Sequence, residues 1–377
     1  MRRRWSWPRL QSMLRTEWRH LTAINRSDRD WRMPFAAALA TGLPLLIGAG
    51  LDRLDFGLVA SFGGLVFLYT TNTPLHHRMV LLMAAAFGMT ASFALGAMSR
   101  IHPPLAVLAL AAVATLVTMV CRYYRVGPPG SLFFIMVAAI GAYSPMTLPQ
   151  LPQQTGLVAL GALLACIVAF FHSLAELRRK PPAPVPPRPP ATFDFVILDS
   201  VIIGVCVGAA LAIAQALQLE RPYWVPVSCL AVIQGASLRA AWTRHVQRIV
   251  GTGVGLLLCW GLLVLPLEKW SIGLLMMALV FVIETLVVRH YGLATVFITP
   301  LTILFAEAAT LGHGAPDAVM QARFIDTLLG CVVGLAGAVC LHNAGFREVL
   351  GRLLRRLLPA RLRAKAQGTG VPPGTAG

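Results

Sequence analysis

Residues 239–255, RAAWTRHVQRIVGTGVG, place three arginines and a histidine directly before a glycine-rich apolar run. The motif GTGVG could cradle a phosphate only if it lay between a strand and a helix. The residues before it, YWVPVSCLAVIQGASL at 223–238, are apolar but interrupted by Pro226 and Gln234. The residues after it, VGLLLCWGLLVL at 254–265, stay apolar for longer than a soluble βα unit allows. The stretch therefore predicts a helix that begins in water and continues into a bilayer.

The composition of the whole chain agrees with a membrane protein. Hydrophobic residues make up 57% of the 377 residues and charged residues only 12%, whereas a soluble domain has about 25% charged residues. The mean hydropathy is +0.71, and the apolar residues recur in blocks of a length suited to crossing a bilayer. We therefore expect an all-α polytopic membrane protein.

Twelve apolar blocks can be counted, and the basic residues support that number. The blocks are 34–50, 56–70, 79–98, 104–120, 131–145, 155–174, 195–217, 223–236, 247–266, 270–288, 293–308 and 325–342. With a cytoplasmic N-terminus and alternating crossings, all but five of the 32 Lys and Arg residues fall on the cytoplasmic side, as the positive-inside rule requires. The five exceptions are Arg53, Arg100, Arg221, Lys269 and Arg323. The net charge of +17 is thus explained by topology and lipid contact, and we expect no nucleic-acid partner.

The chain divides into two halves of six crossings each, which have the features of repeats. The predicted regions are a cytoplasmic amphipathic segment (1–33), a first six-helix repeat (34–177), a proline-rich linker (178–194), a second repeat (195–342) and a basic tail (343–377). Arg78 and Arg248, and likewise Tyr124 and Tyr291, recur at an offset close to 170 residues. An even number of crossings gives both repeats the same orientation, with both chain ends in the cytoplasm.

The residues around the opening stretch resemble the signature of the fusaric acid resistance and aromatic acid exporter proteins. That signature has an aromatic-Trp-x-Pro opening, an apolar run ending in a polar residue, an arginine, and then Arg-x-x-Gly-Thr-x-x-Gly. The matching residues are Tyr223, Trp224, Pro226, Gln234, Arg239, Arg244, Arg248, Gly251, Thr252 and Gly255. Residues 323–330, RFIDTLLG, resemble a second element, whereas the first half keeps only His77 and Arg78. The large cytoplasmic domain of many relatives is reduced here to the linker.

The resemblance implies a multi-pass protein of the bacterial inner membrane that exports aromatic carboxylates or related toxic organic acids, driven by protons. Plant malate channels share the expected fold, so an organic-anion channel is the alternative. The expected partners are a small organic anion and the lipid bilayer. A homodimer through small-residue helix faces and a periplasmic adaptor protein both stay open. No cofactor is implied.

Candidate anion-binding residues gather before the ninth block, because guanidinium groups bind carboxylates and stack on aromatic rings. We expect a site between the halves, lined by the short second, fifth, eighth and eleventh blocks, since interrupted segments mark transport sites. Glycines such as Gly251 and Gly255 are expected to let neighbouring helices approach closely. The expected substrate-binding residues are Arg239, Arg244, Arg248, Gln234, Trp242, Tyr223, Trp224, Arg78 and Arg289.

Four carboxyl groups in or beside the apolar blocks are candidates for proton coupling, because ionisable groups in a membrane are costly and usually functional. They are Glu307, Glu284, Asp326 and Asp199. Glu307 has the fewest basic neighbours in the sequence and is the first choice. Glu284 could instead pair with Arg289 or Arg248, and Asp326 with Arg323.

Enzyme and scaffold functions are the alternatives from other classes. His313 and Asp317 superficially resemble an acyltransferase pair, but their spacing is wrong and no nucleophile accompanies them. The seven cysteines are scattered, without a C-x-x-C pair, and predict neither disulfides nor a metal site. We therefore expect neither catalysis nor a bound metal.

Overall fold

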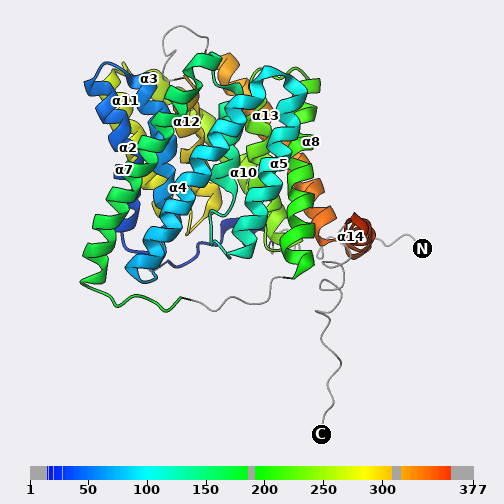
Figure 1. Cartoon of the computed structure of the whole chain (residues 1–377). Coiled ribbons are helices and arrows are strands. Elements are labelled where there is room, and N and C mark those ends of the chain that lie inside the picture. Colours follow the sequence, from blue (N-terminus) through cyan, green and yellow to red (C-terminus); the bar gives the residue numbers. More distant parts are fainter. Residues whose placement is uncertain are drawn as a thin grey trace.

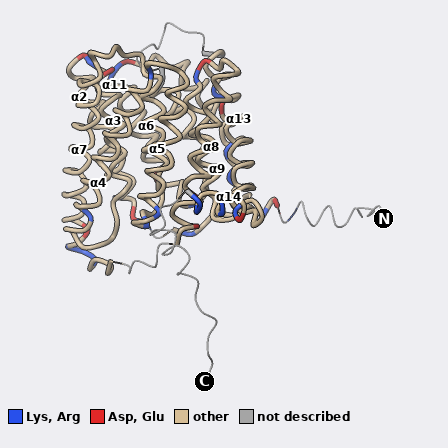
Figure 2. Tube along the Cα trace, turned by 45° about the vertical axis from the view of Figure 1, so that its right-hand side comes forward, with Lys and Arg blue, Asp and Glu red and all other residues tan. Residues whose placement is uncertain are grey.

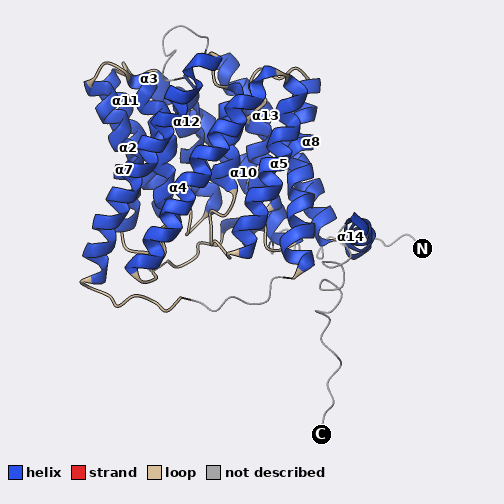
Figure 3. Ribbon diagram, viewed as in Figure 1, coloured by secondary structure: helices blue, strands red, loops and turns tan. Residues whose placement is uncertain are grey.

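The computed structural model describes residues 15, 17–19, 21–27, 29–185, 192–307 and 316–357. All regular structure in these ranges is helical, and they contain no strand. The helices stand side by side as one bundle (Figure 3). The prediction of an all-α fold is confirmed.

Within the described ranges, eight helices are long and apolar enough to cross a bilayer. They are α2 (Arg32–Gly50), α4 (Leu75–Met98), α5 (Pro103–Tyr123), α7 (Leu151–Leu177), α8 (Asp199–Ala216), α10 (Leu238–Leu263), α11 (Lys269–Leu286) and α13 (Pro316–His342). A π-helical turn, Asp194–Leu198, precedes α8 and lengthens that span to 23 residues. The chain is therefore a multi-pass membrane protein.

Four shorter apolar helices occupy the second, fifth, eighth and eleventh predicted blocks. They are α3 (Leu54–Gly64), α6 (Leu132–Tyr143), α9 (Trp224–Ile233) and α12 (Tyr291–Glu307). A 3-10 segment, Leu65–Tyr69, prolongs α3. Pro226 does not interrupt a helix as expected, because it lies in the first turn of α9, where a missing N–H costs little. α9 ends instead at Ile233, with Gln234 as its C-cap residue.

Contacts between distant residues show which chain segments share an end of the bundle. Arg29 pairs with Glu284 at the end that also holds residues 178–185 and α14 (Ala344–Leu357) (Figure 1). The opposite end holds the loop after α2, where Lys269 pairs with Asp52. The tube in Figure 2 shows Lys and Arg at both ends and few charges along the middle of the bundle.

The glycine-containing helix faces pack against neighbours within the same chain. A Cβ at Gly161 of α7 would lie 1.7 Å from the carbonyl oxygen of Ala60, and one at Gly330 of α13 2.3 Å from that of Val225. Gly255 of α10 faces α12, where an added Cβ would lie 2.6 Å from the carbonyl oxygen of Val296. The expectation of close helix packing is confirmed. Because these faces are already filled, they are not the surface through which a homodimer could form.

Corresponding helices of the two halves make corresponding contacts. α3 packs on α7 as α9 packs on α13, and α4 packs on α6 as α10 packs on α12. Between the halves, α5 packs on α8 as α11 packs on α2. This pairing is what two repeats of the same orientation would produce, and it supports that prediction.

The C-terminal segment contains a helix where the sequence was expected to give only a basic tail. In α14, Phe346, Val349 and Leu353 are exposed, while Leu350 and Leu354 pack on the lower ends of α8 and α13. Of the amphipathic segment expected at 1–33, residues 15, 17–19, 21 and 22 are helical, and residues 1–14 lie outside the described residues.

Candidate functional site

Arg248 is buried where α9, α10 and α12 meet. It shares a face of α10 with Gly251 and Gly255, and this face packs on α12. Its Nη1 donates to the hydroxyl of Tyr291 at 2.9 Å and its Nη2 to the hydroxyl of Ser228 at 3.2 Å. The side chain is 5% exposed, and its Nε has no partner. Arg248 is thus a buried cation held by neutral hydroxyl groups.

Arg323 is a second buried cation nearby, on the face of α13 that packs on α9. Its guanidinium lies over the ring of Trp224, 4.1 Å from the ring centroid. The residue is 3% exposed, and neither Nε nor Nη1 has a hydrogen-bond partner. Arg323 also interacts electrostatically with Arg248. Two guanidinium groups from different helices therefore share one buried region.

Asp326, one helical turn after Arg323, supplies a carboxylate to this region. It is 1% exposed, and its Oδ2 has no hydrogen-bond partner. The two residues interact electrostatically, yet the described part of the chain contains no close ion pair between them. We define the anion cluster as Arg248, Arg323, Asp326 and the α9 residues Trp224 and Ser228.

Sequence reasoning missed Arg323 as a candidate because the twelfth block was taken to begin at residue 325. α13 begins at Pro316, so Arg323 lies within the helix and not in an outer loop. The available signal was the spacing to Gly330, which lies seven residues later on the same face and contacts α9.

Arg78, the counterpart of Arg248 in the first half, has a different environment. Its Nη1 contacts Glu176 of α7 at 2.6 Å, and its Nε donates to the carbonyl of Thr73. The side chain is 2% exposed. Arg78 is therefore neutralised by a carboxylate within the protein, and its expected role in substrate binding stays a prediction.

The other expected substrate-binding residues divide into two groups. Arg244 lies 5.9 Å from the ring centroid of Tyr291 and so adjoins Arg248. Tyr223 packs on Trp224 at 5.1 Å, next to the cluster. Three residues contact other parts of the chain, and a fourth is exposed. Arg239 forms an ion pair with Glu17, and Gln234 donates a hydrogen bond to the hydroxyl of Ser131. Trp242 stacks on His245 of the same helix. Arg289 is exposed, and its backbone carbonyl accepts a hydrogen bond from the Asn25 N–H.

The N-terminal segment covers the same end of α10 and α12. Gln247 donates to the carbonyl of Leu21 at 3.0 Å, and Nε2 of His290 lies 2.7 Å from that oxygen. Arg239 and Arg289 are thus placed under this segment and do not join the buried cluster.

Two of the four expected proton-coupling groups are held in ion pairs. Asp199 contacts Arg122 at 2.7 Å and also Arg347, which ties α8 to α5 and α14. Glu284 contacts Arg29 at 3.2 Å, so the expected pairing with Arg289 or Arg248 is wrong. The side chain of Glu307 lies outside the described residues, as do the side chains of His313 and Asp317.

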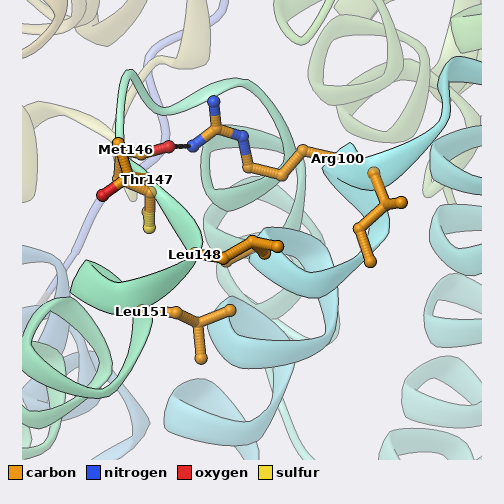
Figure 4. Close-up of a pocket in the computed structure, with 7 residues that line it drawn as sticks. Arg100, Met146, Thr147, Leu148 and Leu151 are labelled. Carbon is orange, nitrogen blue, oxygen red and sulfur yellow. Dashed lines mark hydrogen bonds between the residues drawn. The ribbon is translucent and has the colours of Figure 1, made fainter.

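The short helices meet in pairs between the halves. α6 packs on α9, and Phe62 of α3 stacks on Phe305 of α12 with centroids 5.2 Å apart. Two pockets lie elsewhere. One of about 330 Å³, with Arg100 donating to the carbonyl of Met146, is at the end of α4 (Figure 4). The other, of about 560 Å³, lies between α10 and α13 beside Trp260.

The described residues offer no group of three metal-ligating side chains. All seven cysteines are free thiols, and five of them are buried. The anion cluster is the candidate site among the described residues.

Comparisons with known proteins agree on the class. Residues 201–337, which run from α8 to α13 and include the anion cluster, match the family model described as fusaric acid resistance protein-like. The chain is 21% identical to the uncharacterized membrane protein YvaC of Bacillus subtilis, over 89% of this chain and 76% of that protein. It is 28% identical to the uncharacterized protein YhfK of Escherichia coli, over 37% of this chain and 19% of that protein. No solved structure matches the chain significantly. The second half thus matches a fusaric acid resistance protein-like domain, and the chain is similar over most of its length to a membrane protein.

Proposed function

We propose that the protein exports aromatic carboxylates or related organic acids across the bacterial inner membrane. The observation that carries this proposal is the environment of Arg248, a 5%-exposed cation whose described partners are the hydroxyls of Tyr291 and Ser228. A buried charge is costly unless it is compensated. An anionic substrate would supply the missing charge when it binds.

The comparison of the two halves supports this role for Arg248. Arg78 has its counter-charge built in through Glu176. Arg248 has no described carboxylate within ion-pair distance. The family description, which names resistance to an organic acid, points in the same direction.

The proposed topology has twelve crossings in two like-oriented repeats, with both chain ends in the cytoplasm. This number is reached if the four short apolar helices are counted as crossings together with the eight long ones. The end that holds α14 and residues 178–185 is the cytoplasmic one under the positive-inside rule. Arg248 then lies on the helix that rises from the cytoplasmic side, with Arg244 nearer to its mouth.

We propose that export is driven by the proton gradient. Asp199 and Glu284 are poor proton carriers because each already has an arginine partner. Glu307 and Asp326 are the remaining candidates in the membrane region.

Transport by purified protein in liposomes tests the proposal. Benzoate serves as an aromatic carboxylate and benzyl alcohol as its neutral analogue, each with and without a pH gradient. An exporter accumulates benzoate against its concentration gradient only when the pH gradient is present. Protein-free liposomes give the passive movement of the neutral acid; a channel would speed the equilibration of benzoate above that level without a pH gradient, and a scaffold or an enzyme would add nothing to it.

A further inference from the structure

We propose that Arg323 forms a second anion-binding position, at which the carboxylate of an aromatic monocarboxylate lies between Arg323 and Arg248. This inference deepens the proposed function and rests on it for the identity of the substrate class. An anion could bind to Arg248 of α10 without any contact to α13, and the inference adds Arg323 of α13 as a second contact.

The first argument is the unused hydrogen-bonding capacity of Arg323. Nε and Nη1 are buried without a partner, and Nε of Arg248 is in the same state. Leaving a buried polar group unsatisfied costs about 1–3 kcal/mol, and more for a charged group. Three guanidinium nitrogens without a partner, on two neighbouring arginines, call for an acceptor, and a carboxylate can accept several hydrogen bonds at once.

The second argument is the charge of the cluster. Arg248 and Arg323 interact as two like charges, and Asp326 is the carboxylate that opposes them from the next turn of α13. The Asp326 carboxylate is also attracted by Arg221 and repelled by Glu220. With Asp326 ionised, the anion cluster carries one net positive charge. One monoanion would neutralise it.

The third argument is the position of Trp224. Its ring forms one wall beside Arg323, and Tyr223 packs against it. A guanidinium stacked on an indole can still donate hydrogen bonds, because its N–H groups point outward in the plane of the guanidinium. The adjoining aromatic surface suits a ligand whose carboxylate is attached to a ring.

The same tryptophan provides a local reporter. We would titrate the purified protein in lipid nanodiscs with benzoate and follow tryptophan fluorescence. The expected signal saturates with benzoate, is absent with benzyl alcohol, and disappears in Trp224→Phe. Trp270→Phe is the matched control, because Trp270 is exposed next to Lys269 at the opposite end.

Three charge variants test the role of Arg323 itself. Arg323→Gln should weaken benzoate binding at least tenfold. Arg323→Lys keeps the charge but loses the fork of donors, so it should also weaken binding and remains informative if the Gln variant does not fold. Asp326→Asn removes the competing carboxylate and should tighten binding several-fold, which a damaged fold would not do. Arg53→Gln, at an exposed arginine paired with Asp55, should bind as the unmodified protein does.

The outcomes separate this inference from the proposed function. Wild-type binding in Arg323→Gln, or a looser complex in Asp326→Asn, would overturn the second anion position even if liposomes transport benzoate. Binding that depends on Arg323 without any transport in liposomes would support the position and contradict the exporter. Transport without any fluorescence response that depends on Trp224 would overturn the position and leave the exporter intact.

Discussion

Arg78 of α4 and Glu176 of α7 form a 2.6 Å ion pair, although 98 residues separate them in the chain. Arg78 is 2% exposed, so removing its partner would leave a buried cation without compensation. The pair compensates the buried charge of Arg78 within the protein, whereas Arg248 has no such partner among the described carboxylates.

Glu176→Gln should therefore lower stability without touching the anion cluster. We expect a loss of about 1–3 kcal/mol, because Glu176 is 29% exposed and water can partly replace it. A thermal melt in detergent measures this as a lower Tm. Glu348→Gln, at an exposed acid on α14, is the control and should melt like the unmodified protein. Equal melting of both variants would show that the ion pair does not stabilise the protein.

The close approach of α7 to α3 and of α13 to α9 gives a second prediction. Gly161→Ala places a Cβ 1.7 Å from the Ala60 carbonyl and should cost about 3 kcal/mol, since overpacking forces helices apart. Gly330→Ala should behave alike against Val225, as expected if the two halves are repeats.

Gly156→Ala is the matched control on the same helix as Gly161. A Cβ there meets nothing within 4 Å, so the variant should be neutral or gain up to about 1 kcal/mol from helix propensity. Expression level and Tm provide the comparison. A stable Gly161→Ala protein would mean that α3 and α7 are not in this contact.

Much of the fold could be predicted because it follows from the composition and from the spacing of apolar residues and glycines along the chain. The long apolar blocks indicated the spans, and the glycine spacings indicated the packing faces. The four short helices were also predicted, as the short second, fifth, eighth and eleventh apolar blocks. The end of a helix was harder, because Pro226 can begin a helix as easily as it can stop one.

The partners of charged residues could not be predicted, because they depend on tertiary contacts. Arg29 and Glu284 are 255 residues apart, and no local pattern connects them. Arg323 was assigned to a loop because the twelfth block was predicted to begin two residues after it, whereas α13 already begins at Pro316. Arg248 was found because it stands beside a motif, but its isolation from carboxylates is visible only in three dimensions.

The topology gives a third prediction, which labelling with a membrane-impermeant maleimide checks. Pro184→Cys and Pro372→Cys should react only after the cells are permeabilised, because both are predicted to be cytoplasmic. Asp52→Cys, at the other end of the bundle, should react in intact cells. The native background is low, as five of the seven cysteines are buried. Labelling of residues 184 and 372 from opposite faces would contradict the even number of crossings.

Proton coupling gives a fourth prediction. Glu307→Gln keeps the size of the side chain but cannot carry a proton, so it should abolish benzoate accumulation driven by a pH gradient in liposomes. Downhill movement and thermal stability should be unchanged. The control is Glu284→Gln, whose acid pairs with Arg29 and should affect stability more than coupling. Uphill transport at the normal rate would exclude Glu307 as the carrier and direct the same test to Asp326.

Arg248→Lys gives the last prediction. Arg248 reaches Tyr291 of α12 with one terminal nitrogen and Ser228 of α9 with the other. A lysine places its three donors on a single nitrogen and lacks the planar fork with which Arg248 spans the two hydroxyls and keeps Nε for a carboxylate. The charge and the topology should survive, so the variant should insert and melt nearly as before. Benzoate affinity should fall about tenfold, which is roughly 1.4 kcal/mol.

The neutral analogue and a second arginine make this test specific. Benzyl alcohol has no carboxylate, so the Arg248→Lys change should leave its interaction with the protein unaltered. Arg53→Lys, at an exposed arginine bonded to Asp55 on the opposite end, should alter neither ligand. If Arg248→Lys weakened benzoate and benzyl alcohol equally, the arginine would be acting through the packing of α9, α10 and α12. A loss confined to benzoate would instead show that the guanidinium recognises the anion.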